Sequence, residues 1–97
     1  MNSWLITGGC GFIGSSLIEY LLLKNNRSIR IIDNLSVGTR NDLRKVCKFS
    51  EKSADEVIAR PEGIELVVAD VRNQEDVVKA ARGCDVVVHL AANTGVG

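Results

Sequence analysis

Near the N-terminus, four glycines fall within the eight residues 7–14, T-G-G-C-G-F-I-G. The stretch lies between a short apolar run, 4–7, and a longer one, 12–23. Glycines at this spacing let a strand turn sharply, let the backbone approach a phosphate and let a helix pack closely on a strand. The first N–H groups of the following helix are unpaired and partially positive. We therefore interpret the stretch as a cradle for a pyrophosphate.

Two overlapping glycine patterns fit this stretch. A G-x-G-x-x-G pattern begins at Gly9 and matches the dinucleotide fingerprint, whereas the wider G-x-x-G-x-x-G pattern begins at Gly8. Both end at Gly14. The fingerprint also calls for an acidic residue about 20 positions further on, after the next strand. Asp33 follows Gly14 by 19 residues and ends an apolar run.

Apolar runs and helical patterns alternate along the chain. The apolar runs predict strands over 4–7, 29–32, 64–69 and 85–90. Helices are predicted over 12–23, over about 41–46, and between an N-cap at Asn73 and a stop at Gly83. The more polar stretch 48–61 is interpreted as a surface insertion, with a capping box at Ser53 and Glu56 that starts one or two helical turns.

This alternation predicts an α/β fold, part of a Rossmann-type doubly wound parallel sheet with strand order 3-2-1-4. In such a sheet the ligand crevice opens where the winding reverses, between the strands at 4–7 and 85–90. The glycine turn and the A-A-N turn at 91–93 are expected to face each other across that crevice.

The charge balance argues against two classes of partner. Lys and Arg number 12, and so do Asp and Glu, so there is no net field to attract nucleic acid or an anionic membrane. No apolar run is long enough to span a bilayer, and the N-terminus lacks the flanks of a signal peptide. A single small cytoplasmic domain is expected from the 97 residues.

The cysteines and the histidine are expected to be structural. Cys10, Cys47 and Cys84 are odd in number and widely spaced, which indicates neither a disulfide framework nor a zinc site. A thiol at Cys10 could be activated by the helix terminus, but a small residue filling a tight turn is the favoured interpretation. His89 has no partners spaced for a metal site or a catalytic triad.

Four motifs at the ends of the four predicted strands match one family. They are T-G-G-x-G-F-I-G at 7–14, D-N-L-S-x-G at 33–38, D-V-R at 70–72 and H-L-A-A at 89–92. With them, the chain resembles the N-terminal part of the extended short-chain dehydrogenase/reductases, specifically the NAD-dependent nucleotide-sugar epimerases and dehydratases of the UDP-glucose 4-epimerase type. On this basis residues 1–97 form the N-terminal part of an NAD-binding Rossmann domain.

The resemblance implies NAD as the cofactor and a set of cofactor-binding residues. These are Gly8, Gly11, Phe12, Ile13, Gly14, Asp33, Asn34, Ser36, Gly38, Asp70, Val71, Leu90, Ala91, Ala92 and Thr94.

The resemblance also implies a role for each group of these residues. Backbone N–H groups of 12–13 would bond the pyrophosphate, and Asp33 would accept hydrogen bonds from the adenosine ribose. Residues 70–71 would bracket the adenine edge. Residues 90–92 would line the route to the nicotinamide ribose, and Thr94 stands where some relatives place another cofactor contact.

The carboxylate of Asp33 favours NAD over NADP. It suits a free 2′-hydroxyl and repels a 2′-phosphate. Arg40 lies close enough in the sequence to meet such a phosphate, although arginines in such loops are usually solvated.

The family's catalytic groups are not expected within this chain. They are a Tyr-x-x-x-Lys pair on a later helix and a Ser or Thr after a later strand. Tyr20 and Lys24 have the pair's spacing but lie on the helix after the glycine turn, where a structural role is expected. No catalytic or metal-binding residue is therefore assigned. The 97 residues alone are expected to be inactive, and the nucleotide-sugar substrate is expected to bind in the full-length protein.

Three functions remain open from the sequence. The first is the NAD-binding part of a nucleotide-sugar epimerase or dehydratase that acts by transient hydride transfer. The alternative is a non-catalytic dinucleotide-binding or sensor protein of the same fold. The third, an S-adenosylmethionine methyltransferase, is disfavoured by the third glycine and by the D-N-L-S-x-G run. A homo-oligomer is expected, because the valine-rich strand at 85–90 would form an open sheet edge.

Overall fold

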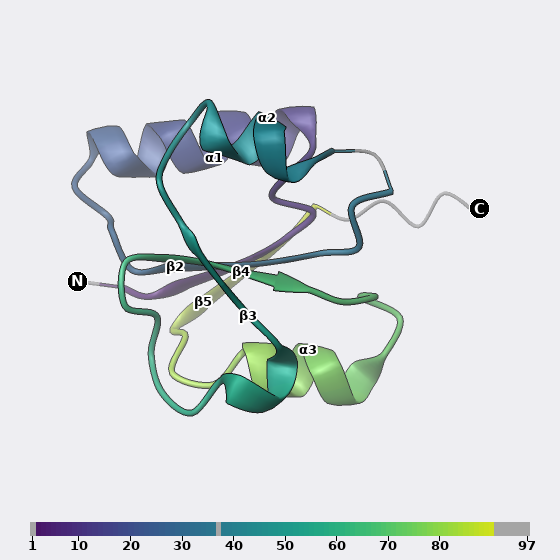
Figure 1. The fold of residues 1–97 in the computed structure, drawn as a ribbon. Coiled ribbons are helices and arrows are strands. Elements are labelled where there is room, and N and C mark those ends of the chain that lie inside the picture. The colour runs from purple at the N-terminus through teal and green to yellow at the C-terminus, as the bar shows by residue number, and fades with distance from the viewer. Residues whose placement is uncertain (1, 37, 91–97) are drawn as a thin grey trace.

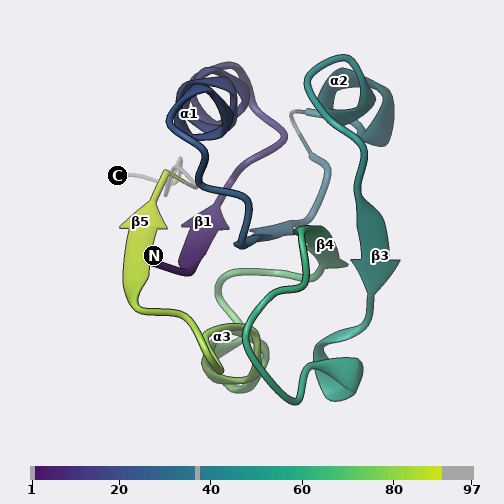
Figure 2. The same cartoon turned by 90° about the vertical axis from the view of Figure 1, so that its left-hand side faces the viewer.

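A parallel five-stranded sheet forms the centre of the computed structural model, which describes residues 2–36 and 38–90 (Figure 1). Its strands are β1 (Trp4–Thr7), β2 (Ile29–Asp33), β3 (Ser50–Lys52), β4 (Ile64–Val68) and β5 (Val86–His89). They lie in the order β3-β4-β2-β1-β5, which can be followed in Figure 2. All four pairings are parallel.

Helices cover both faces of the sheet. They are α1 (Phe12–Leu23), α2 (Arg40–Arg44), the 3₁₀ turn η1 (Ala54–Glu56) and α3 (Gln74–Ala80). Figure 1 shows α1 and α2 on one face, with η1 and α3 on the other. This is the arrangement of a doubly wound sheet. Among the described helices, none combines the length and hydropathy that a membrane crossing requires.

The predicted strands and their order are confirmed, with one addition. The order 3-2-1-4 is observed as β4-β2-β1-β5. The addition is β3, which lies within the stretch 48–61 and extends the sheet beyond β4. Describing that stretch only as a surface insertion was therefore wrong. Its strand has the sequence Ser-Glu-Lys, so neither an apolar run nor an alternating pattern marks it.

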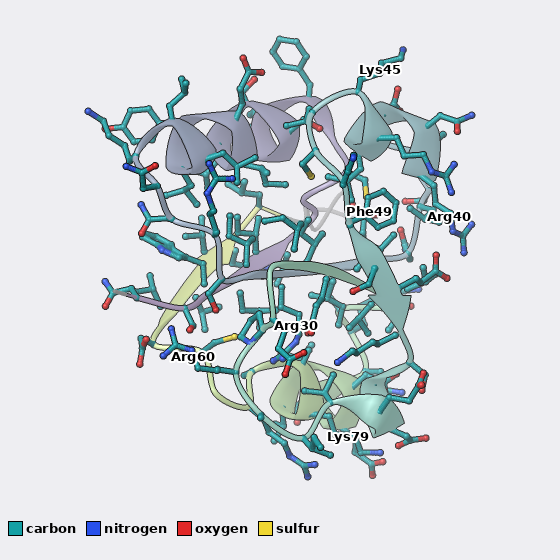
Figure 3. The ribbon with its side chains drawn as sticks, turned by 60° about the vertical axis from the view of Figure 1, so that its left-hand side comes forward. Arg30, Arg40, Lys45, Phe49, Arg60 and Lys79 are labelled. Atoms are coloured by element: carbon teal, nitrogen blue, oxygen red, sulfur yellow. The ribbon has the colours of Figure 1, made fainter. Side chains whose placement is uncertain are left out.

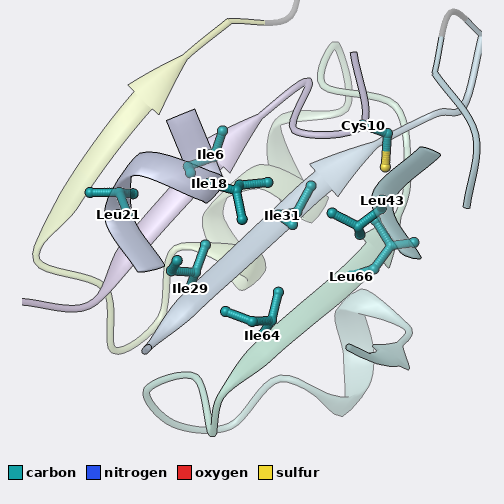
Figure 4. Close-up of a cluster of buried hydrophobic side chains, with 9 residues drawn as sticks. All are labelled: Ile6, Cys10, Ile18, Leu21, Ile29, Ile31, Leu43, Ile64 and Leu66. Atoms are coloured by element: carbon teal, nitrogen blue, oxygen red, sulfur yellow. The ribbon is translucent and has the colours of Figure 1, made fainter. Parts of the chain in front are cut away.

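Two apolar clusters, one on each face, hold the layers together. Side chains of a strand alternate between faces, so Ile29 and Ile31 of β2 join the cluster on the α1 side, while Ile32 joins the other. Figure 4 shows the first cluster, in which Ile18 and Leu21 of α1 pack over β1 and β2. Every residue of β2 is buried, so the end of this strand is fixed by the core.

A buried arginine ties β2 to α3. Figure 3 shows Arg30 between the sheet and α3. Its Nε donates to Oε1 of Glu65 at 3.0 Å, and one terminal nitrogen donates to the carbonyls of Ala80 at 2.8 Å and Arg82 at 2.6 Å. The other donates to the carbonyl of Ala59 at 2.6 Å. The guanidinium therefore satisfies carbonyls at the C-terminal end of α3, where a cation is favoured.

Glu65 is the buried anion of this network. Its burial opposes ionisation, but the N–H of Glu62, the Lys52 ammonium and the Arg30 guanidinium together hold the pKa of Glu65 below its usual range. Lys52 lies 3.1 Å from Oε2 of Glu65. Because Lys52 belongs to β3, the network also joins the edge strand to the sheet.

Replacing Arg30 with Met should destabilise the folded protein. Arg30→Met leaves the Glu65 carboxylate and three carbonyls without their buried donor, which should lower the free energy of unfolding by about 3–5 kcal/mol. Urea denaturation followed by circular dichroism measures it. The control is Arg72→Met, which breaks an exposed ion pair and should change stability little. Equal effects of the two substitutions would contradict the role assigned to Arg30.

Candidate functional site

The carboxyl ends of the parallel strands bring several predicted site segments to one edge of the sheet. Thr7 at the end of β1 is paired with Ile32 on one side and with His89 on the other. Asp33 is paired with Val68 at the end of β4. The segments that follow these four strands therefore begin side by side. The winding reverses between β1 and β5, the position predicted for the ligand crevice.

The glycine turn leads directly into α1. Gly8 has φ of 77°, a left-handed conformation that glycine adopts without strain, and its N–H donates to the carbonyl of Ile32 at 2.8 Å. Gly11 is the N-cap of α1 and supplies no side-chain cap. The first N–H groups of the helix, including those of Phe12 and Ile13, have no intrahelical acceptor. This end of α1 therefore presents donors and a partial positive charge to a ligand.

The other glycines allow close backbone packing. A Cβ on Gly14 would lie 2.4 Å from the carbonyl oxygen of Gly8 and 2.6 Å from the Cα of Gly9. A Cβ on Gly9 would lie 2.5 Å from the Ile31 side chain. Helix α1 thus rests on the turn, and the turn rests on β2. At Gly11 the nearest atom to an added Cβ is the Gly8 carbonyl oxygen, 3.5 Å away, so a methyl group would make only an ordinary van der Waals contact.

Asp33 joins the glycine turn to the loop after β2. Its side chain is 7% exposed, and Oδ2 accepts the N–H of Cys10 at 2.9 Å. Oδ1 accepts the N–H of Leu35 at 2.7 Å. An ionised carboxylate has about four acceptor sites, so the carboxylate keeps capacity for a further donor. The acid predicted at this position therefore lies directly beside the glycine turn.

The loop after β2 packs against the same turn. The Asn34 Oδ1 accepts the N–H of Ser36 at 3.0 Å, and Leu35 has φ of 62°. Gly38 is buried, and a Cβ there would lie 1.8 Å from the carbonyl oxygen of Cys10. Only glycine allows this approach, so the structure brings the D-N-L-S-x-G motif and the glycine turn together.

Asp70 has a partner that the sequence does not reveal. Its carboxylate accepts a hydrogen bond from the backbone N–H of Arg72 at 2.8 Å and one from a terminal guanidinium nitrogen of the same residue at 2.8 Å. These hydrogen bonds from Arg72 hold the pKa of Asp70 below its usual range. The backbone N–H of Ala69 donates to the Asp33 carbonyl at 3.1 Å, which places the two acids at one edge. The neighbouring Val71 packs against the apolar cluster on the α3 side.

The end of β5 is tied to the end of β1 through a threonine. The Leu90 N–H donates to both the carbonyl oxygen and the Oγ1 of Thr7, each at 3.0 Å. Nδ1 of His89 lies 2.8 Å from the same Oγ1. Sequence reasoning missed this contact because the partners lie more than 80 residues apart. The predicted site residues Ala91, Ala92 and Thr94 lie outside the described residues.

Cys10 is buried and unreactive. It is 1% exposed, and burial together with the Asp33 carboxylate raises the pKa of its thiol to about 12. A thiolate, the reactive form, is therefore scarce at neutral pH. Within residues 2–36 and 38–90, no group of three or more His, Cys, Asp or Glu side chains could hold a metal ion.

Tyr20 and Lys24 pack on each other on the surface of α1. The Lys24 ammonium lies 5.7 Å from the centroid of the Tyr20 ring, and the tyrosine is 55% exposed. A cation over an aromatic face is a favourable surface contact. Both residues are in the last third of the helix or beyond it, away from the glycine turn at its start.

Two surface hollows lie elsewhere. One, of about 370 Å³, is beside α3 and is lined by Gln74, Glu75, Val78, Lys79 and Arg82. The other, of about 570 Å³, lies between α2 and β3 and is lined by Arg44, Cys47, Lys48, Phe49 and Glu51. Neither includes the glycine turn or Asp33.

Comparison with known proteins finds one matching family model and several similar sugar-nucleotide epimerases. Residues 5–97 match the 3-beta hydroxysteroid dehydrogenase/isomerase family. The probable UDP-arabinose 4-epimerase 3 of Oryza sativa subsp. japonica is 36% identical over 95 residues, which are 96% of this chain and 21% of that protein. The putative UDP-glucose 4-epimerase of Methanocaldococcus jannaschii is 32% identical over 95% of this chain and 25% of its own length. The chain thus spans about a quarter of the length of these relatives.

A solved structure shares the fold. The Thermus thermophilus UDP-glucose 4-epimerase in complex with NAD superposes with a TM-score of 0.67 and is 31% identical, covering 94% of this chain and 24% of that one. The resemblance to the extended short-chain dehydrogenase/reductases is therefore confirmed.

Substitutions of two glycines should differ in their effect on stability. Gly14→Ala places a methyl group 2.4 Å from the Gly8 carbonyl oxygen and should lower the free energy of unfolding by about 1–3 kcal/mol through overpacking. Gly11→Ala meets no atom within 3.4 Å and should change stability by less than Gly14→Ala does. Urea denaturation of both variants measures the difference. A Gly14→Ala protein as stable as the original would contradict the packing described for α1.

Proposed function

The chain belongs to the 3-beta hydroxysteroid dehydrogenase/isomerase family, and we propose that it is the NAD-binding part of a nucleotide-sugar epimerase or dehydratase. One observation carries the proposal. The Asp33 carboxylate bonds the N–H of Cys10 within the glycine turn at 2.9 Å. The proposed phosphate cradle and the proposed acceptor for ribose hydroxyls are therefore in direct contact, which favours a ligand that spans both.

The residues present fit the pyrophosphate and the adenosine ribose. The N–H groups of Phe12 and Ile13 would donate to the pyrophosphate, and Gly11 has no side chain to obstruct it. The acceptor sites left on Asp33 would take the ribose hydroxyls. Because Asp33 is held by two N–H groups, its carboxylate is oriented before the ligand arrives.

The remaining contacts extend along the same edge. Asp70 and the backbone of Val71 would bracket the adenine, with the Asp70 carboxylate held in place by Arg72. Leu90 would begin the route to the nicotinamide ribose from the end of β5. Asn34, Ser36 and Gly38 would lie beside the ribose.

Bound NAD would supply hydride chemistry, accepting a hydride from a sugar carbon and returning it after inversion or elimination. The chain's own part is to bind and orient the cofactor. The names of the relatives, which include sugar-nucleotide 4-epimerases, favour this chemistry. The proton-transfer groups and the sugar site belong to the family's later segments. The 97-residue chain alone should therefore show no turnover.

The proposal predicts that Asp33→Asn weakens NAD binding. Loss of the charged acceptor should raise the dissociation constant for NAD by about tenfold or more, because hydrogen bonds to a charged group contribute about 1.5–3 kcal/mol. Isothermal titration calorimetry measures it. Asp55→Asn, which removes an exposed carboxylate on η1, is the control and should leave binding unchanged.

The same titration tests the choice of ligand. NAD should bind more tightly than NADP or S-adenosylmethionine. Tighter binding of either of those two compounds to the unmodified chain would contradict the proposed function.

A further inference from the structure

Arg40, the first residue of α2, is held by a carboxylate from another element. Its Nε lies 2.7 Å from Oε1 of Glu51, and a terminal nitrogen lies 3.0 Å from Oε2. Such a two-point contact is the strongest geometry for an arginine and a carboxylate. The side chains are 43% and 42% exposed, so the pair is at the surface. Figure 3 shows Arg40 at the α2 and β3 side of the sheet.

Arg40 lies close to the proposed cofactor site. Gly38, two residues earlier, packs against the backbone of Cys10 and Gly11. Two residues span at most about 7 Å of chain, and arginine has a long side chain. A released Arg40 side chain would therefore be within reach of the rim of the glycine turn.

Two local features fix both ends of the pair. A capping box between Thr39 and Asp42 sets the start of α2, with the Asp42 carboxylate 2.9 Å from the Thr39 N–H. Glu51 is the middle residue of β3 and is paired with Leu66 of β4. Since both backbones are fixed, little further ordering is needed for the side chains to meet.

We propose that Glu51 is a positioning residue for cofactor specificity, which holds Arg40 away from the place where a 2′-phosphate would bind. This inference rests on the proposed function. Arg40 is the only cation in residues 34–40, and an arginine in this loop is the group that accommodates the 2′-phosphate of NADP. Asp33 repels that phosphate, and Glu51 withholds the cation that would compensate.

The size of the effect follows from the exposure of the pair. Exposed ion pairs are weak, so the restraint should shift the preference between cofactors severalfold rather than absolutely. NAD has no 2′-phosphate, and its binding should not depend on whether Arg40 is free.

The test is calorimetric titration of the 97-residue chain and its Glu51→Gln variant with NAD and with NADP. Glu51→Gln should tighten NADP binding by about three- to fivefold and leave NAD binding within about twofold. The gain should vanish in the double variant Arg40→Gln/Glu51→Gln, because the gain acts through Arg40.

A control variant tests whether the loss of any surface negative charge has the same effect on cofactor binding. Asp55→Asn also deletes one negative charge from an exposed ion pair, in this case with Lys79, and should leave the ratio of the two affinities unchanged. Thermal unfolding of each variant checks that the fold is retained.

The outcomes separate this inference from the proposed function. If the chain binds NAD but Glu51→Gln leaves the ratio unchanged, the role of Glu51 is wrong and the proposed function stands. The same holds if the gain survives in the double variant or also occurs in Asp55→Asn. If the unmodified chain binds no NAD, the proposed function fails and the role of Glu51 fails with it.

Discussion

The hydrogen bonds of the Asp33 carboxylate join the glycine turn to the loop after β2. The carboxylate is nearly buried, and burying a charge without partners would cost several kcal/mol. The N–H groups of Cys10 and Leu35 provide those partners, one from each of the two loops that meet there. Because β2 is buried along its whole length, the core fixes the carboxylate, and the carboxylate in turn fixes both loops. The start of α1 then points its free N–H groups to the same place.

Close backbone contacts at two glycines pack α1 and the loop after β2 against the glycine turn. Gly14 brings α1 onto the turn, and Gly38 brings the second loop onto it. On the opposite face, Arg30 joins β2 to the end of α3, and Glu65 joins β4 to β3 through Lys52. The edge strand β3 is therefore anchored from inside the protein, although its own residues are polar. Residues held by elements that are anchored in this way are already oriented before a ligand binds.

The sequence predicts the parts of this structure that depend on local patterns, and misses those that depend on distant partners. The glycine spacing, the apolar runs and the acid at Asp33 were enough to predict four strands, their order and the turn that leads into α1. The three-residue strand β3 has no apolar period, so only its pairing with β4 defines it. Arg30 sits in an apolar run, and its partners lie 29 to 52 residues away. Likewise, the contact of Arg40 with Glu51 depends on where β3 runs.

The most direct test of the account is to follow the backbone amide signals of the chain by two-dimensional ¹H–¹⁵N NMR during titration with NAD. The largest shifts should fall at the start of α1, at Gly11, Phe12 and Ile13, and at Leu35 beside Asp33. Shifts confined to the hollow beside α3 or to the one between α2 and β3, or no shifts at saturating NAD, would contradict it.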